Sequence, residues 1–318
     1  MKEVWGAMLP RHILRVDQFS RGDLLQLLAH SAEMRRVVAA GGDKRLDGKI
    51  LATLFFEPST RTRLSFESSM LRLGGNVISS ESAEHTSSAV KGESIEDTIR
   101  IVEAYADAIA IRHPLAGAAE TAASVASVPI LNAGDGPREH PTQALLDLYT
   151  IYDELGRIDD LTVALVGDLR FGRAPRSLAM LLTRTENARV LLVAPPGIEM
   201  SGDVLAYMET HGVAWEQLHD LEEALPRADV IYMTRVQKER FPSVESYRRV
   251  SGSYRLGSEH MKLLGQNAIV MHPLPRVDEI DTLVDSDPRA AYFRQARNGV
   301  YIRMALLDLL LGPRLLTA

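Results

Sequence analysis

The alternation of short apolar runs with stretches of helical periodicity is the feature that most constrains this fold. Apolar runs typical of buried strands occur at residues 50–56, 107–112, 128–132, 161–166, 189–194, 229–234 and 267–271. Helical patterns alternate with them, at residues 20–39, 62–73, 94–105, 141–155, 174–185, 219–225 and 299–311. This order predicts an α/β fold in which parallel sheets are covered by helices on both faces.

The length of the chain, 318 residues, favours two domains over one. A polar stretch at residues 153–160 follows one of the predicted helices and suggests a boundary near residues 150–160. We therefore predict two doubly wound parallel-sheet domains in tandem, and the final helix could pack on either of them.

Composition excludes several classes of function. The 36 basic and 42 acidic residues give a net charge of −6, which argues against non-specific nucleic-acid binding but leaves room for a local basic pocket. The absence of cysteine excludes disulfides, thiolate metal sites and cysteine nucleophiles, and it agrees with a cytoplasmic location. The N-terminus shows no secretory signal, and no apolar run approaches the ~20 residues of a membrane span. We therefore expect a cytoplasmic protein with neither nucleic acid nor membrane as a partner.

Polar residues collect where the predicted strands end, and in doubly wound sheets ligands bind beyond these carboxyl ends. Arginine recurs there, whereas carboxylates are few; the arginines are Arg61, Arg112, Arg173, Arg235, Arg240 and Arg276. His140 and Gln143 follow the strand predicted at residues 128–132. A site rich in guanidinium groups suits substrates that carry several negative charges.

The start of the helix predicted at residues 62–73 has an unusual charge. A helix N-terminus is already positive, yet Arg61 and Arg63 lie there beside the hydroxyls of residues 59–62. An anion-binding site explains Arg61, because backbone N–H groups, hydroxyls and a guanidinium together hold a phosphate or similar dianion. The alternative is that both arginines point into solvent or pair with Glu57 and Glu67, and for Arg63 the i, i+4 spacing to Glu67 favours this second interpretation.

Seven motifs, in order from residue 55 to residue 280, make the chain resemble the catalytic chains of the aspartate carbamoyltransferase family, within the aspartate/ornithine carbamoyltransferase superfamily. They are FFEPSTRTRLSFE, KGES, IRHP, NAGDGPREHPTQALLDL, VGDLRFGR, YMTRVQKER and MHPLPRVDEI. The resemblance implies transfer of a carbamoyl group from carbamoyl phosphate to the α-amino group of L-aspartate, an early step of pyrimidine synthesis. No cofactor or metal is expected, because carbamoyl phosphate is already an activated mixed anhydride and the chemistry needs orientation and charge neutralisation.

The resemblance also implies where each part of carbamoyl phosphate binds. The residues expected to hold the phosphate are Ser59, Thr60, Arg61, Thr62 and Arg112. The groups expected to donate to the carbamoyl oxygen are Thr62, Arg112 and His140, so the expected catalytic residues are these three and Arg61, which contacts the leaving oxygen. The groups expected to accept hydrogen bonds from the amide nitrogen are Gln143 and the backbone carbonyls of Pro273 and Leu274. We also expect a cis peptide bond before Pro275 and a structural role for His272 ahead of this turn.

For the acceptor amino acid, the resemblance implies that Arg173 and Arg235 bind its two carboxylates, with Gln237 assisting Arg235. Ornithine is disfavoured, because the related ornithine enzymes carry a His-Cys-Leu-Pro motif and this chain has no cysteine. One departure leaves the acceptor open: Ala174 stands where the family commonly has threonine.

Alternatives are therefore a carbamoyltransferase with another acceptor and a catalytically silent trimer that serves as a scaffold. The silent trimer predicts substitutions among the anion-binding residues, and none is seen. A dinucleotide-dependent oxidoreductase is disfavoured, since no strand is followed by G-x-G-x-x-G.

Assembly and domain movement are also implied by the resemblance. Ser87 and Lys91, in the polar loop at residues 79–94, are expected to enter the site of an adjacent subunit in a homotrimer, and regulatory chains or a dihydroorotase are possible further partners. A carbamoyl-phosphate domain would comprise residues 1–140 and the C-terminal helix at 296–318, and an aspartate domain residues 141–295, with the active site in the cleft between them. Glu57 is expected to pair with Arg173 and Arg240 when the domains close, or otherwise with Arg61 or Arg63 inside its own domain.

Overall fold

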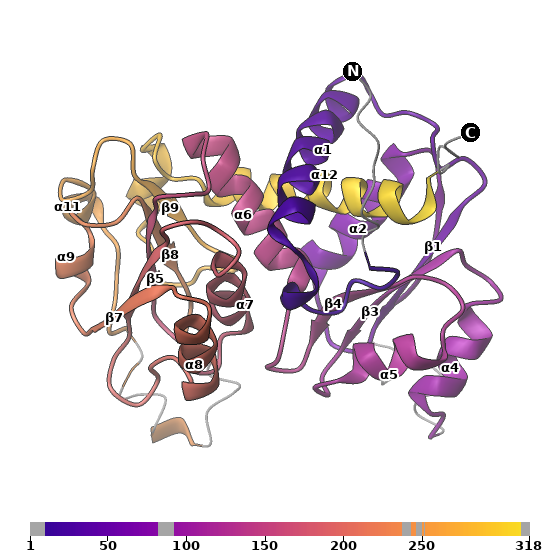
Figure 1. Cartoon of the computed structure of the whole chain (residues 1–318), viewed down its shortest axis with the longest axis horizontal. Coiled ribbons are helices and arrows are strands. Elements are labelled where there is room, and N and C mark those ends of the chain that lie inside the picture. Colours follow the sequence, from indigo (N-terminus) through magenta and orange to yellow (C-terminus); the bar gives the residue numbers. More distant parts are fainter. Residues whose placement is uncertain (1–9, 82–91, 237–242, 246–249, 251, 313–318) are drawn as a thin grey trace. The chain divides into compact units, whose positions relative to one another are not determined.

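The structure is a computed structural model that describes residues 10–81, 92–236, 243–245, 250 and 252–312 (Figure 1). The chain divides into two compact units. The first unit comprises Met1–Thr142 and Gly299–Ala318, and the second comprises Gln143–Asn298. The division falls inside two helices, α6 (Pro141–Leu155) and α12 (Tyr292–Leu311), rather than in the polar stretch at residues 153–160. Both helices run on without a break, so the composition of the loops does not mark this boundary.

The sheet of the first unit is parallel throughout, in the order β2-β1-β3-β4. Its strands are β1 (Ile50–Phe55), β2 (Asn76–Glu81), β3 (Ala108–His113) and β4 (Ile130–Asp135), and its remaining helices are the 3₁₀ turn η1 (Val16–Gln18), α1 (Arg21–Ala39), α2 (Thr60–Arg72), α4 (Ile95–Val102) and α5 (Ala118–Val125). Alternate residues of β1 face opposite ways: Ala52 and Leu54 join the apolar cluster under α4 and α5, whereas Thr53 points to α2 and bonds Glu67. Helices therefore cover both faces.

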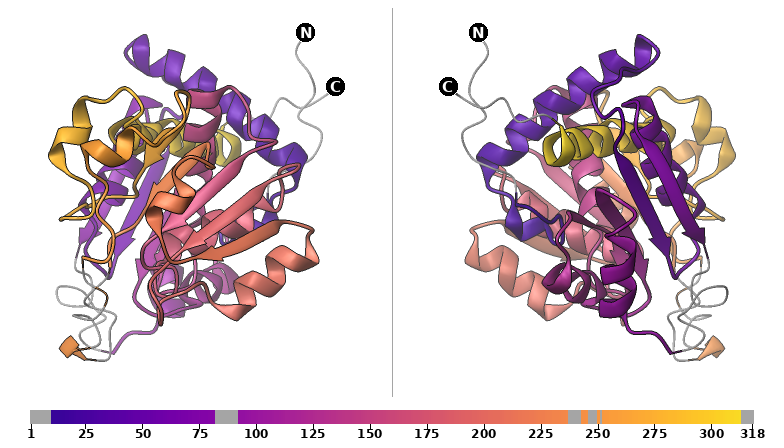
Figure 2. Two further views of the ribbon diagram at one scale, coloured as in Figure 1. Left: turned by 90° about the vertical axis from the view of Figure 1, so that its left-hand side faces the viewer. Right: turned by 90° about the vertical axis from the view of Figure 1, so that its right-hand side faces the viewer.

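The second unit has a five-stranded parallel sheet in the order β7-β6-β5-β8-β9. Its strands are β5 (Thr162–Val166), β6 (Arg189–Val193), β7 (Ala214–Leu218), β8 (Val230–Met233) and β9 (Ile269–Met271), and its remaining helices are α7 (Arg173–Leu182), α8 (Gly202–Thr210), α9 (Leu221–Ala224), α11 (Ser258–Met261) and the 3₁₀ turn η4 (Thr282–Ser286). One apolar cluster lies under α7 and α8 and a second under α9 and α11, so the central strands are buried on both faces. Figure 2 gives two further views of the ribbon, in which the strands of each sheet can be followed by their colours.

The predicted fold class is confirmed, since each predicted strand corresponds to an observed one. The sequence missed β2 and β7, the edge strands whose sequences NVISSE and AWEQL are polar and half-exposed. It also missed α5, α8 and α11, and it started α12 several residues late. Residues 79–81 of the predicted loop belong to β2, and residues 82–91 lie outside the described part of the chain. Among the helices of the described ranges, none combines the length and apolar character needed to cross a membrane.

Candidate active site

The first turn of α2 carries a cation that no acidic group within the described part of the chain neutralises. Ser59 is the N-cap residue, but its hydroxyl makes no capping hydrogen bond and so stays available to a ligand. Arg61 is exposed, and among the described residues no carboxylate forms an ion pair with it. Partial desolvation lowers the pKa of Arg61, but a guanidinium stays charged at neutral pH. Thr62, next to it, is buried. A free guanidinium at a positive helix end is the arrangement that an anion-binding site requires.

Arg63 behaves differently from Arg61, two residues away. Its guanidinium lies 3.3 Å from Glu67 and 2.8 Å from Glu81 at the end of β2. The predicted i, i+4 pair with Glu67 is thus confirmed, and the charge of Arg63 is satisfied inside the protein.

Arg112 lies beside the same helix start because β1 and β3 are paired in register, with Phe55 opposite Arg112. The backbone N–H of Phe56 donates to the carbonyl of Arg112 at 2.9 Å. The Arg112 side chain is only 12 % exposed, and its Nη2 lies 3.0 Å from Glu57 Oε2. The alternative prediction, that Glu57 pairs with Arg61 or Arg63 inside its own domain, was therefore wrong. The strand register places Arg112 next to Glu57 instead. Pairing of Glu57 with Arg173 or Arg240 stays a prediction.

The segment before His140 is held in place by three hydrogen bonds that the Asp135 carboxylate accepts. One carboxylate oxygen of Asp135 accepts from Asn132 Nδ2 and the N–H of Glu139, and the other accepts from the N–H of Gly117. Gly136 has a φ of +51°, and a Cβ there would lie 2.8 Å from the carbonyl oxygen of Pro114. The loops after β3 and β4 are thus locked together, and they bring Arg112 and the buried His140 to the same edge of the first sheet.

Arg303 of α12 is a residue that sequence reasoning missed. It is buried, donates to Ser65 Oγ at 2.9 Å and to Thr142 Oγ1 at 3.2 Å, and lies over the Phe66 ring. This one side chain joins α2 to the start of α6 within the first unit. Nothing local in the sequence distinguishes it from a solvent-exposed helical arginine.

Glu139, next to His140, is a buried carboxyl group with an altered acidity. It is 4 % exposed, and its Oε2 accepts from the N–H of Val16 at 2.9 Å. Its pKa is raised to about 7, first by burial and also by the charges of Asp17 and Asp135, whereas the N–H of Val16 and the charge of Arg15 oppose the change. The folded protein therefore keeps a proton here that the unfolded chain loses near 4.5.

This carboxyl group should make stability fall with rising pH. Between about 4.5 and about 7 the folded state binds more protons, so the free energy of unfolding decreases as pH rises, by up to about 3 kcal/mol from this group. Glu139→Gln keeps an acceptor for Val16 but cannot ionise. We expect the variant to lose this slope and to be more stable than wild type near pH 8, measured by urea unfolding at several pH values. Parallel curves for the two proteins would contradict this assignment.

In the second unit, Arg173 and Arg235 follow the carboxyl ends of the neighbouring strands β5 and β8. Gly167 makes this geometry possible: its φ is +113°, and a Cβ would lie 2.4 Å from the carbonyl oxygen of Thr234. The N–H of Asp168 donates to Thr234 Oγ1 at 3.1 Å and so links the two strand ends again. Arg173 starts α7 and is largely buried. Both predicted carboxylate clamps thus come from the edge of the sheet where ligands bind.

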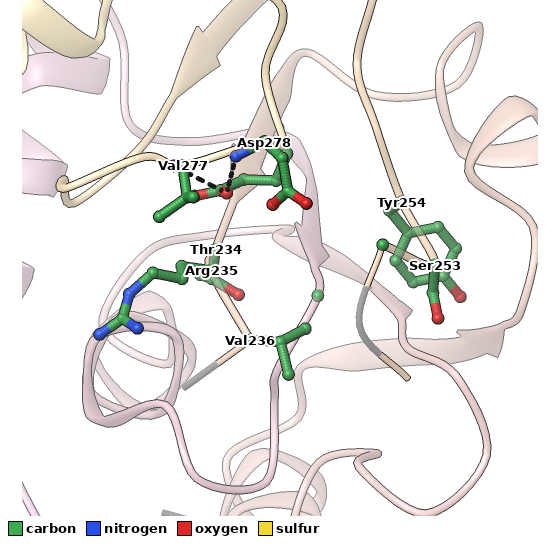
Figure 3. A pocket seen from close by; sticks show the side chains of 10 residues that line it. Thr234, Arg235, Val236, Ser253, Tyr254, Val277 and Asp278 are labelled. Carbon is green, nitrogen blue, oxygen red and sulfur yellow. Dashed lines mark hydrogen bonds between the residues drawn. The ribbon is translucent and has the colours of Figure 1, made fainter. Parts of the chain in front are cut away.

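Arg235 lines a pocket of about 90 Å³ (Figure 3). Its other walls are Gly167, Thr234, Val236, Gly252, Ser253, Tyr254, Val277, Asp278 and Glu279. The N–H groups of Val277 and Asp278 donate to Glu279, as the dashed lines in Figure 3 show. Sequence reasoning found Arg235 but missed Ser253 and Tyr254, because the loop that carries them has no signal beyond polarity.

The turn after β9 is built around His272, as predicted. Its Nδ1 accepts from the N–H of Leu274 at 2.8 Å, so Nε2 carries the proton and donates to Glu279 at 2.6 Å. Burial alone would raise the pKa of Glu279, but hydrogen bonds from His272 and the backbone bring it below its ordinary value. The Leu274–Pro275 bond is cis, which confirms the prediction.

The remaining residues predicted for the site do not take part in the hydrogen bonds and ion pairs described above. Gln143 lies in the first turn of α6, in the second unit. Ser87, Lys91, Gln237 and Arg240 lie outside the described residues. Ala174, where the family commonly has threonine, lies in the first turn of α7 and packs, partly buried, against the apolar core of the second unit.

Each of the two all-parallel α/β units has arginines at the carboxyl edge of its sheet: Arg61 and Arg112 in the first, Arg173 and Arg235 in the second. This arrangement is typical of a class of enzyme that handles two anionic substrates. The family models agree. The carbamoyl-phosphate-binding domain of aspartate/ornithine carbamoyltransferases matches residues 11–153, and the aspartate/ornithine-binding domain matches residues 159–310. The chain therefore belongs to the aspartate/ornithine carbamoyltransferase family.

Individual relatives narrow the likeness to aspartate enzymes. An aspartate carbamoyltransferase catalytic subunit from Methanopyrus kandleri is 52% identical over 306 residues, covering 95% of this chain and 97% of that one. A chloroplastic aspartate carbamoyltransferase from Oryza sativa subsp. japonica is 50% identical over 309 residues, covering 95% and 85%. The crystal structure of Trypanosoma cruzi aspartate transcarbamoylase in complex with carbamoyl phosphate and aspartate superposes with a TM-score of 0.89 at 44% identity, covering 96% of this chain and 100% of that one.

Proposed function

We infer that this chain is an aspartate carbamoyltransferase, which transfers the carbamoyl group of carbamoyl phosphate to the α-amino group of L-aspartate. The products are N-carbamoyl-L-aspartate and phosphate, in pyrimidine biosynthesis. The observation that carries this function is the guanidinium of Arg61 at the N-terminus of α2, which forms no ion pair with any carboxylate of the described residues. A phosphate would find backbone N–H groups, hydroxyls and a positive charge together there. A relative of 44% identity binds both substrates.

For the first substrate we assign the phosphate to residues 59–62 and Arg112. The α-amino nitrogen attacks the carbamoyl carbon, the bond between that carbon and the bridging oxygen breaks, and the phosphate leaves with the electron pair. The proton that the attacking nitrogen gives up passes to the leaving phosphate, which is a base. Arg61 would stabilise the charge that develops on the leaving oxygen, and Thr62, Arg112 and His140 would donate to the carbamoyl oxygen in the tetrahedral intermediate. Since the substrate is already activated, these groups need only orient it and neutralise charge.

For the second substrate we assign the two carboxylates of aspartate to Arg173 and Arg235, with Gln237 as an additional donor. Paired guanidinium–carboxylate hydrogen bonds give directional recognition that lysine could not supply. An ornithine ammonium group would be repelled by Arg235. The methyl group of the partly buried Ala174 packs against the apolar core, so the alanine has a structural role that does not require a different acceptor.

We also propose that the enzyme is a cytoplasmic homotrimer in which Ser87 and Lys91 complete the site of a neighbouring subunit. The support is the resemblance of the KGES loop to the same loop of the family. Lys91 would add a further positive charge beside the phosphate, and an isolated subunit would then be inactive.

An acceptor panel tests the reaction. Purified protein is incubated with carbamoyl phosphate and L-aspartate, D-aspartate or L-ornithine, and both phosphate and carbamoylated product are measured. We expect L-aspartate to accelerate phosphate release and to appear as the N-carbamoyl product, with ornithine at least about a hundredfold less effective. Equal activity with ornithine, or release that does not depend on aspartate, would overturn the assignment.

A further inference from the structure

Asp147 is a fully buried carboxylate in the second unit that meets three side chains from different elements. Its Oδ1 accepts from Gln143 Nε2 at 2.9 Å and from Gln295 Nε2 at 2.7 Å, and its Oδ2 accepts from the Tyr232 hydroxyl at 2.7 Å. We propose that Asp147 is a positioning residue that orients the groups that recognise the amide nitrogen of carbamoyl phosphate. This inference rests on the proposed function and adds a specificity determinant to it.

The orientation of the Gln295 amide follows from a backbone group. The N–H of His272 donates to Gln295 Oε1 at 2.8 Å, and a backbone N–H can only donate. The NH₂ group of Gln295 must then face Asp147, so Asp147 accepts from it. This reasoning fixes the carboxylate as the acceptor at the centre of the cluster.

The same carboxylate sets the amide of Gln143. These two residues stand four apart on α6, on one face of the helix, and the acceptor oxygen of Asp147 draws the NH₂ end of Gln143 toward the interior. The carbonyl end of the half-buried Gln143 then points away from Asp147. A carbonyl oxygen is what an amide nitrogen of the substrate needs as a partner, and a reversed amide would offer it a repelling NH₂ group.

Asp147 also reaches the second set of acceptors. Through Gln295 it holds the N–H of His272, at the start of the turn whose Pro273 and Leu274 carbonyls we assign to the same substrate nitrogen. Thus one buried carboxylate orients both the Gln143 amide and the turn after β9, and it would determine how well the site distinguishes an amide from a methyl group.

Tyr232 provides a matched control. Tyr232 lies in β8, far from the two glutamines in the sequence, and its hydroxyl donates to the other oxygen of Asp147. Tyr232→Phe removes the hydrogen bonds of this hydroxyl to Asp147 and to Gln143, but it leaves Asp147 Oδ1 as the acceptor for both Gln143 and Gln295. If Asp147 served only to hold the helices and sheet together, Asp147→Asn would weaken carbamoyl phosphate and acetyl phosphate equally, and any effect of Tyr232→Phe would also be equal for the two.

The test compares carbamoyl phosphate with acetyl phosphate, in which a methyl group replaces the amide nitrogen. For each variant we measure kcat/KM for carbamoyl phosphate and the inhibition constant of acetyl phosphate competing with it. Asp147→Asn should lower kcat/KM for carbamoyl phosphate by about tenfold to a hundredfold, while acetyl phosphate binds within about threefold of wild type. Tyr232→Phe should change neither by more than about threefold. In a Gln143→Ala background, Asp147→Asn should have a smaller effect than in wild type, because the part of the effect that acts through Gln143 is already lost.

Equal losses for both ligands in folded Asp147→Asn, or full additivity with Gln143→Ala, would overturn the proposal and leave the proposed function intact. Should Asp147→Asn fail to fold, Gln295→Met removes the bonds of Gln295 to Asp147 and to His272 but leaves Gln143 its acceptor on Asp147. It must still weaken carbamoyl phosphate selectively for the proposal to stand. An inactive wild-type enzyme in the acceptor panel would instead refute the function itself.

Discussion

Replacing Arg61 with alanine is expected to lower kcat by about a hundredfold to a thousandfold, the loss of ~3–4 kcal/mol typical of removing one group that stabilises transition-state charge. The charge on the bridging oxygen grows as the bond to the carbamoyl carbon breaks, and Arg61 is the cation at the α2 N-terminus that no carboxylate within the described residues neutralises. The fold should be unaffected, since the exposed side chain forms no ion pair there. Steady-state kinetics and thermal unfolding of the variant measure both effects.

Arg63 supplies the control for this experiment. It lies on the same turn of the same helix, but its charge is already satisfied by Glu67 and Glu81. Arg63→Ala should therefore keep kcat within about threefold of wild type and cost at most ~1 kcal/mol of stability. If Arg61→Ala and Arg63→Ala had the same activity, the positive charge at this helix end would have no special role in the reaction.

Mixing two inactive variants is expected to restore activity if the sites are shared between subunits. Homotrimers of Lys91→Ala and of Arg61→Ala should each be almost inactive, because every site lacks one essential group. After dissociation and re-association of an equal mixture, roughly a quarter of the sites would combine an intact Arg61 with an intact Lys91 from the neighbour. Activity should rise accordingly from near zero, as measured by phosphate release.

The matched control mixes Arg61→Ala with His140→Ala, since both residues are assigned to the same subunit's share of the site. Each subunit then lacks one group of its own site, and no exchange of Lys91 loops can repair it. This mixture should stay inactive. Lasting inactivity of the Lys91 and Arg61 mixture, with hybrid trimers confirmed by mass, would show that the site does not draw Lys91 from a neighbour.

Much of the fold was readable because buried parallel strands must be almost continuously apolar. β5 and β6 are buried on both faces, and their sequences TVALV and RVLLV are correspondingly apolar after the first residue. The edge strands β2 and β7 were missed for the converse reason: one side faces solvent, and polar residues such as Ser79 and Glu216 interrupt the pattern.

Local chemistry of the site was equally readable. The cation at the start of α2 and the pair of Arg63 with Glu67 follow from the geometry of a single helix, where residues within four positions meet. The strand-end arginines follow from the rule that parallel strands present their carboxyl ends at one edge. These inferences need no knowledge of how distant segments pack.

What the sequence by itself determined, then, is which segments become buried strands or helices and which charged groups reach the sheet edges, because both depend on nearest neighbours along the chain. Only the tertiary structure decided the partners of those groups. Glu57 pairs with Arg112 because the register of β1 against β3 sets Phe55 opposite Arg112. Asp147 looks like an ordinary helix residue in QALLDLY, and it becomes the centre of a cluster because packing brings Tyr232 and Gln295 onto one buried face of α6. Strand register and the packing of α6 bring together residues far apart in the chain, so no local pattern could predict these contacts.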